Sequence, residues 1–437
     1  MSAFLAHAAA TLARGGRVSG LPEGAAAWAV AQSVRGPTWV VLPTPEEAER
    51  FARALAFWLD AGGPASSDRV SPACHRVRVL PWPADDLPPY SGVSPHPGHV
   101  RDRIVALDAL RRQEHAIVVA PAEALLERVP EPDVLAPAVL EVTPGRALPR
   151  AMLLATLARF GYLSAALVED PGTWAVRGGV VDVWPTGEPT PVRIDLFDEE
   201  VETLRRFDPA TQRSGVVLPA LRVLPARLWS PDAAAVERLA EATRIPAGTQ
   251  RDAMALRRRV LETLGSRLAF AGVEDWIAGL HPVASPLDHA PSTILALDAD
   301  RMVDPVEDLA QRAAARWSDL GCDERPLVPP EDRFDPPDDL IARLEGAPGL
   351  ETLPVEDPDR PTLVLGVQGT ADLAVTGGEL APFVAQLGRW LEDGWRVALV
   401  APGRADAERL LALLAPHGVQ PEEVAHRDPD RLRAGRV

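Results

Sequence analysis

Short apolar segments alternate with amphipathic helical segments over residues 1–145, and this alternation restricts the fold more than any other feature of the sequence. Residues 38–42, Thr-Trp-Val-Val-Leu, are apolar enough for a strand that is buried on both faces. Thr44 then stands at a helix N-cap position with Glu47 three residues later, which is the spacing of a capping box. Because parallel strands are joined by helical crossovers, the pattern predicts an α/β fold with a parallel sheet covered on both faces. Two further strands are expected at 77–80 and 116–120, with a helix between them at 98–112.

The pattern changes near residue 145, where short extended segments separated by turn residues replace the longer alternation. After a helix at 148–160, four predicted strands fit a small antiparallel sheet: 173–176, 180–184, 191–197 and 201–207. Gly178 and Gly179 separate the first two strands and predict a bulge or tight bend. An apolar segment at 293–298 predicts a strand that rejoins the first sheet, so the α+β domain would be an insertion.

Four parts are therefore expected along the chain, the third completing the first: 1–145, 146–224, 225–345 and 346–437. The third part has predicted helices at 232–242, 250–268 and 306–320. Pro- and Asp-rich sequence at 328–339 and 355–361 predicts a linker. Beyond it, predicted strands at 362–365 and 395–400 and helices at 380–393 and 404–414 indicate a small α/β unit.

A glycine-containing loop near the amino terminus is the candidate for a nucleotide site. A phosphate-binding loop reads GxxxxGK[ST], in which the lysine contacts phosphate and Ser or Thr binds magnesium. Counted from Gly20, these two positions are Ala26 and Ala27, and Glu23 would repel phosphate. The acidic strand end that would complete such a site has Asp298 without a second carboxylate beside it. The sequence therefore predicts no ATP chemistry, no cofactor and no metal site in this chain.

Composition excludes several classes of function. All 45 basic residues are arginine, which excludes mechanisms that need a Schiff-base lysine or a phosphate-loop lysine. The net charge of −17 argues against a stand-alone nucleic-acid binder. Cys74 and Cys322 belong to no metal-binding pattern. No apolar segment approaches the ~18 residues that span a bilayer, and the start lacks the pattern of a secretory signal, so we expect a cytoplasmic protein without membrane contact.

The most informative segment is residues 192–197, Val-Arg-Ile-Asp-Leu-Phe. Strand alternation places Val192, Ile194 and Leu196 on one face, where they can fill a core. Arg193, Asp195 and Phe197 lie on the other face, and exposed arginine and aromatic side chains are favoured at protein-binding sites. The alternative is that Phe197 packs under a helix and Arg193 pairs with Asp195. Residues 146–224 carry a net charge of −1 against −16 for the rest of the chain, so this domain is the least acidic part.

Segments around this strand resemble the bacterial transcription-repair coupling factors (Mfd). The similar segments in the expected insertion are 174–185 (WAVRGGVVDVWP), 191–197 (PVRIDLF) and 206–214 (RFDPATQRS). Shorter similar segments lie outside it, at 80–82, 89–91, 94–96 and 272–276. The resemblance runs from the first expected part into the fourth.

The resemblance implies a fold and a partner. In this family the amino-terminal third is similar to UvrB: a RecA-like domain without ATPase function, split by an inserted domain. The inserted domain binds UvrA, and the residues similar to the family's contact set are Arg177, Arg193 and Phe197. Weaker candidates for the rim of the contact are Arg205, Arg206 and Arg213. The family's RNA-polymerase-interacting domain and its DNA-translocating motor, which uses ATP and magnesium, are expected beyond residue 437.

The leading hypothesis is a non-catalytic adaptor that recruits UvrA of nucleotide excision repair to stalled RNA polymerase. On this hypothesis, alanine at both Arg193 and Phe197 abolishes UvrA binding without lowering the melting temperature. Two alternatives stay open. One is a UvrB-like ATPase that binds damaged DNA, and the other is an autoinhibitory clamp whose same face contacts the expected carboxy-terminal part.

Overall fold

The computed structural model describes residues 3–61, 77–244, 251–266, 268–356, 361–365, 380–394, 397, 399, 404–419 and 421. The chain forms two compact units. Unit 1 comprises residues 1–33, 53–77 and 350–437, and unit 2 comprises residues 34–52 and 78–349. Cys74 and most of the strand expected at 395–400 lie outside the described residues. No helix among the described residues is long and apolar enough to cross a membrane.

The predicted parallel sheet is present in unit 2. Its strands are all parallel and run in the order β15 (Thr293–Leu297), β2 (Thr38–Leu42), β4 (Ala116–Pro121), β3 (Arg78–Pro81). Every residue of β2 and β4 is buried, as expected for strands covered on both faces. The strand from residue 293 rejoins the first sheet beside β2, which confirms that the intervening α+β domain is an insertion.

Helices begin where the capping signals predict. The Glu47 amide donates to Thr44 Oγ1 at 3.3 Å at the start of α3 (Pro45–Ala61), so the capping box is confirmed. Helix α4 (Pro97–Arg111) begins after His96, whose Nδ1 accepts from the Gly98 amide. The remaining short elements around this sheet are η1 (Ala122–Leu125), β5 (Val129–Pro130), α5 (Pro132–Leu135), β14 (Val283–Ala284), η3 (Pro286–Asp288) and η4 (Ala299–Met302).

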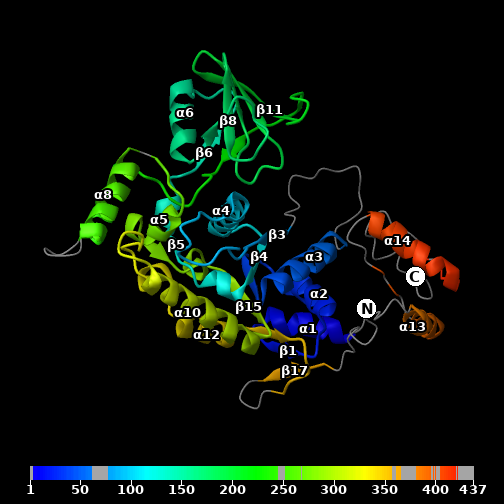
Figure 1. The fold of residues 1–437 in the computed structure, drawn as a ribbon. Helices are drawn as coiled ribbons and strands as arrows, with labels where there is room; N and C mark the ends of the chain where they lie inside the picture. The colour runs from blue at the N-terminus through cyan, green and yellow to red at the C-terminus, as the bar shows by residue number, and fades with distance from the viewer. Residues whose placement is uncertain are drawn as a thin grey trace. The chain divides into compact units, whose positions relative to one another are not determined.

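The inserted domain is a six-stranded sheet with one long helix on it (Figure 1). The strand order is β12 (Ser214–Val217), β11 (Glu200–Phe207), β10 (Val192–Phe197), β9 (Val180–Val183), β8 (Thr173–Arg177), β7 (Leu163–Ser164). Helix α6 (Arg150–Arg159) supplies Leu153 and Leu157 to a core that also contains Val181 and Ile194. Strands β6 (Leu140–Val142) and β13 (Leu221–Val223) pair with each other where the chain enters and leaves this domain.

Helices follow the inserted domain in unit 2. Helices α7 (Ala233–Ala242), α8 (Arg251–Gly265), η2 (Val273–Trp276) and α9 (Ile277–Leu280) share one apolar core. Helix α10 (Val303–Asp319) packs on the core of the parallel sheet. The linker expected at 328–339 is wrong, because α11 (Pro330–Arg333) and α12 (Pro337–Gly346) occupy it. Leu340 and Leu344 of α12 are buried in the same core.

Unit 1 contains α1 (Ala3–Ala13), β1 (Arg17–Ser19), α2 (Glu23–Ser33), β16 (Gly349–Glu351), β17 (Thr362–Val364), α13 (Ala381–Glu392), α14 (Arg404–Leu414) and η6 (Ala415–His417). Strand β1 pairs in parallel with both β16 and β17. The expectation of a separate small unit over 346–437 is therefore wrong, since its first two strands pair with residues 17–19. The buried Val18 lies between these two strands, paired with Leu350 and Leu363.

Candidate protein-binding site

The candidate site lies on the face of the inserted sheet opposite α6, which we call the outer face. Val192 and Ile194 are fully buried and share a core with α6, so the other side chains of β10 lie on the outer face. Following the pairing across neighbouring strands, the outer face carries Arg177, Val180, Asp182, Arg193, Asp195, Phe197, Arg205 and Val217. One end of this face is covered, because Val168 packs there with Ala175 and Phe207.

Phe197 is exposed to solvent over 74% of its surface. It ends β10 and pairs with Glu200 across a two-residue hairpin turn, in which Asp198 has a φ of +58°. The expectation that the ring points outward is confirmed, and the alternative in which it packs under a helix is wrong. An exposed phenyl ring beside charged side chains can bury its apolar area only against another molecule.

Arg193 lies on the expected face, but its guanidinium group is occupied. Its Nε and Nη2 donate to the two carboxylate oxygens of Asp182 at 2.8 and 2.9 Å, and Nη1 donates to Ser214 Oγ at 3.1 Å. The guanidinium carbon also lies 4.8 Å from the centre of the Phe207 ring. The hydrogen bonds that Arg193 donates to Asp182 raise the pKa of Arg193 above its usual value. The alternative pairing with Asp195 is also wrong, because Asp182 stands directly opposite Arg193 on β9.

Arg177 has the opposite environment. It is the last residue of β8, it pairs with Val180 across the Gly178-Gly179 turn, and its side chain is exposed. Within the described part of the chain, this side chain makes no hydrogen bond or ion pair. The turn itself is held by Arg150, whose Nη1 donates to the Gly178 carbonyl at 2.8 Å. Gly178 has a φ of +63°, a conformation that glycine adopts without strain.

The weaker rim candidates differ from one another. Arg205 is exposed opposite Arg193 in register, and Arg213 is exposed in the turn before β12. Arg206 is held by Glu188, with Nη2 and Oε2 2.6 Å apart. Sequence reasoning missed the edge strand β12, which adds Val216 and Val217 at 69% and 61% exposure. The signal was the Gly-Val-Val run that follows the turn at 208–211.

The glycine-containing loop is filled by the protein's own backbone. Only Gly20, Leu21 and Pro22 separate β1 from α2, and Ala26 and Ala27 are fully buried. The Gly20 amide donates to the carbonyls of Glu351 and Leu353 at 2.9 and 3.0 Å. An atom at the Gly20 Cβ position would lie 1.8 Å from the Leu365 carbonyl oxygen. The Gly20 amide, which would face the phosphate in a phosphate-binding loop, is therefore already bonded to backbone carbonyls.

Asp298 lies at the carboxyl end of β15 with a φ of +54°. Its Oδ2 atom is 3.5 Å from Arg301 Nη1, and Arg301 also donates to Glu47. Among the described residues, no group of three or more His, Cys, Asp or Glu side chains could hold a metal ion. The carboxylate of Asp298 thus pairs with an arginine of η4, the turn that directly follows it.

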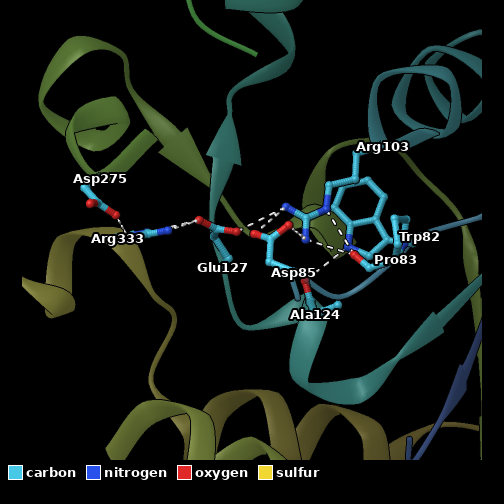
Figure 2. A network of polar contacts seen from close by, with 8 residues as sticks. All are labelled: Trp82, Pro83, Asp85, Arg103, Ala124, Glu127, Asp275 and Arg333. Atoms are coloured by element: carbon cyan, nitrogen blue, oxygen red, sulfur yellow. Dashed lines mark hydrogen bonds and ion pairs between the residues drawn. The ribbon is translucent and has the colours of Figure 1, made fainter. Parts of the chain in front are cut away.

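A buried chain of ion pairs connects the segments around the parallel sheet (Figure 2). It runs Asp85, Arg103, Glu127, Arg333, Asp275, with successive links of 3.1 Å, 3.2 Å and 2.8 Å and a final close contact between Arg333 and Asp275. Burial alone would raise the pKa of Glu127, but the guanidinium groups of Arg333 and Arg103 outweigh it and lower that pKa. Sequence reasoning did not find this network, because its five residues come from five separate segments.

Comparison with known proteins relates the inserted domain, and most of the chain, to proteins of DNA repair. A family model described as "UvrB interaction domain" matches residues 140–229. The transcription-repair-coupling factor of Myxococcus xanthus is 31% identical over 89% of this chain and 33% of that protein. The same factor of Escherichia coli K12 is 29% identical over 78% of this chain and 30% of that protein. UvrABC system protein B of Salmonella arizonae is 32% identical over 28% of this chain and 18% of that protein.

These matches confirm the resemblance to the transcription-repair coupling factors over most of the chain. The chain spans about a third of the length of the curated relatives it matches. The shorter match to UvrABC system protein B agrees with the UvrB-like fold that the resemblance implies.

Proposed function

We propose that this chain is a non-catalytic adaptor that binds UvrA through the outer face of the inserted domain. The observation that carries the proposal is Phe197, an aromatic ring 74% exposed at the end of a strand whose alternate side chains fill the core. It shares the outer face with Arg177, which has no partner among the described residues. Arginine and aromatic side chains are enriched where protein contacts contribute most to affinity.

Each of the three predicted residues has a different proposed role in the contact with UvrA. Phe197 inserts its ring into an apolar recess of UvrA, and Arg177 donates charge-assisted hydrogen bonds to a carboxylate there. Arg193 is already bonded to Asp182 on the neighbouring strand, and we place it at the rim of the contact with UvrA. Bringing UvrA to stalled RNA polymerase would complete the adaptor role through parts of the relatives that this chain does not match.

The non-catalytic part of the proposal rests on the loop at Gly20. A UvrB-like ATPase would need a lysine and a hydroxyl where Ala26 and Ala27 are buried, and amides free to bind phosphate. The Gly20 amide instead donates to Glu351 and Leu353. The proposal therefore includes no nucleotide or metal cofactor for this chain.

The test is the affinity of the purified full chain for UvrA, measured by titration calorimetry. Phe197→Ala is expected to weaken binding at least about 30-fold, the loss typical of a central contact residue, and Arg177→Ala about tenfold. Neither change should lower the melting temperature, because both side chains are exposed. Leu163→Ala is the matched control for an exposed apolar residue, since Leu163 is 70% exposed on the far edge strand β7.

Arg193→Ala is expected to behave differently and lower the stability as well, because it leaves the buried Asp182 carboxylate without its partner. This corrects the expectation that Arg193 and Phe197 could be replaced together at no cost in melting temperature. Absence of UvrA binding by the unmodified chain would refute the function. Binding that survives both Phe197→Ala and Arg177→Ala would refute the site.

A further inference from the structure

A small cavity lies where the inserted domain joins the following helices. Two arginines and one carboxylate line it, so its lining carries a net positive charge. The cavity has a volume of about 110 Å³. Arg159, the last residue of α6, and Arg227 line it together with apolar residues such as Leu135 and Leu228. Its single lining carboxylate belongs to Asp232, which is exposed and caps α7 by accepting from the Ala235 amide.

Arg227 is the unusual residue of this cavity. Its guanidinium carbon lies 4.1 Å from the centre of the Trp229 ring, so the cation is stacked and held in place. Its buried Nε has no hydrogen-bond partner among the described residues. The hydrogen bond that the described residues provide to it is long, 3.4 Å from Nη2 to the Arg159 carbonyl oxygen. An arginine has five N–H donors, so most of the donor capacity of this half-buried group is unused.

Among the residues that the structure describes, no carboxylate forms an ion pair with Arg227. The charge of Glu274 acts on Arg227, but the oxygens of Glu274 accept from Trp229 Nε1 at 3.4 Å and from Ser94 Oγ at 2.7 Å. Burial lowers the pKa of Arg227 below its usual value, which means that the site disfavours the charge it contains. A half-buried guanidinium without a counter-ion is stabilised by any anion that enters the cavity.

The local backbone makes room for this arrangement. Gly161 has a φ of +87°, and a Cβ atom there would lie 2.6 Å from Arg227 Cδ. Only glycine therefore lets the side chain of Arg227 cross the end of α6 and reach the cavity. Arg159 joins it from the same helix end, with its guanidinium carbon 5.5 Å from the Phe160 ring.

We propose that this cavity, which we call the Arg159–Arg227 cavity, binds a phosphate group. Two guanidinium groups match the double negative charge of a phosphate monoester or of inorganic phosphate near neutral pH. The cavity is large enough to admit one tetrahedral oxyanion. The phosphate group could come from the free ion or from a nucleic-acid backbone, and the experiment separates these sources.

The experiment is a titration of the full chain with inorganic phosphate, followed by ³¹P NMR at constant ionic strength set with sodium chloride. Saturable binding at one site per chain is expected. Arg159→Gln and Arg227→Gln should each weaken it about tenfold, because each removes a charge-assisted contact. Arg238→Gln removes the same charge from exposed α7 outside the cavity and should leave the affinity unchanged.

The source of the phosphate group is identified by adding a short single-stranded oligonucleotide without terminal phosphate. Displacement of inorganic phosphate from the site supports a backbone phosphate, and no displacement supports the free ion. Should Arg227→Gln unfold because Trp229 loses its cover, Arg159→Gln decides alone, since that side chain is exposed. Binding that does not saturate, or that Arg159→Gln leaves unchanged, overturns the proposal.

Discussion

Arg193 and Phe197 lie on the same side of the same strand, yet their surroundings are opposite. The side on which each lies follows from alternation within β10 alone. Their partners depend on the neighbouring strand: Asp182 faces Arg193 on β9, whereas Phe197 lies beyond the last paired residue of β9. Arg193 is consequently part of the domain's own structure, and Phe197 remains free for another molecule.

His289 is a second residue whose surroundings the sequence pattern does not reveal. It follows η3, is 3% exposed, and neither ring nitrogen has a hydrogen-bond partner among the described residues. Burial, with a smaller contribution from Arg111, lowers the pKa of His289 to about 4 from 6.5. A neutral imidazole is thus compatible with this site and a charged one is not.

The shift predicts how stability depends on pH. The unfolded chain takes up the proton near pH 6.5 and the folded chain only near pH 4, so the contribution of His289 is complete above pH 6.5 and is lost as the pH falls towards 4. The loss should approach ~1.4 kcal/mol per pH unit within this window. His289→Leu should reduce the slope of the free energy of unfolding against pH, measured by urea denaturation between pH 7.5 and 4.5.

Part of the slope should survive in that variant, because burial also lowers the pKa of His281. The control is His7→Leu, which makes the same change at an exposed position in α1. An unchanged slope in His289→Leu, or an equal reduction in His7→Leu, would contradict the assignment.

At the scale of elements, the junction from β1 to α2 shows what replaced a phosphate-binding loop. Gly20 has a φ of +77°, and its Cα approaches the backbone of Leu365 so closely that a Cβ would overlap the carbonyl oxygen. Gly20→Ala is therefore expected to lower the free energy of unfolding by about 2 to 3 kcal/mol. Gly24→Ala should instead raise it by about 0.5 to 1 kcal/mol, because Gly24 lies inside α2 with open space around it.

Urea denaturation of the two variants provides the measurement. The opposite signs make the comparison specific, since both substitutions add one methyl group within a few residues of each other. A Gly20→Ala variant as stable as the unmodified chain would mean that the carbonyl of Leu365 does not close the loop.

Long apolar strands could be predicted from the sequence, and very short ones could not. The runs that became β2, β4 and β15 are buried on both faces, so their composition alone indicates a strand. Strands β7 and β16 have two and three residues, too few to show a period. The expected linker became α11 and α12 because proline is favoured in the first turn of a helix, where its missing N–H costs nothing.

Part of the candidate site could also be predicted from the sequence. Strand alternation predicted that Phe197 points outward, and the resemblance to the coupling factors identified Arg177 as a contact residue. The partner of Arg193 depends on strand register, which the sequence pattern does not contain. The cavity at Arg227 and the buried ion pairs depend on segments that approach one another only in the fold.

At the scale of the whole of unit 2, buried charge is gathered in one network. Asp85, Arg103, Glu127, Arg333 and Asp275 come from five segments between residues 85 and 333, and each arginine bridges two carboxylates (Figure 2). Arg333 is 8% exposed and also lies 5.0 Å from the Tyr90 and Phe334 rings. The network therefore joins the segment between η1 and β5, through Glu127, to the helices that follow the inserted domain, through Asp275.

Removing Arg333 tests whether this network stabilises the fold. Arg333→Met keeps much of the volume but leaves Asp275 buried without a cation and Glu127 with Arg103 as its remaining partner, so the free energy of unfolding should fall by about 3 to 5 kcal/mol. Arg312→Met is the control, because the Arg312 side chain is 49% exposed and its pairs with Asp308 and Glu123 should contribute less than about 1 kcal/mol. Equal losses in urea denaturation would show that burial of the network does not matter. Since Phe197 lies in the inserted domain and the network lies outside it, folded Arg333→Met protein should keep the affinity for UvrA of the unmodified chain.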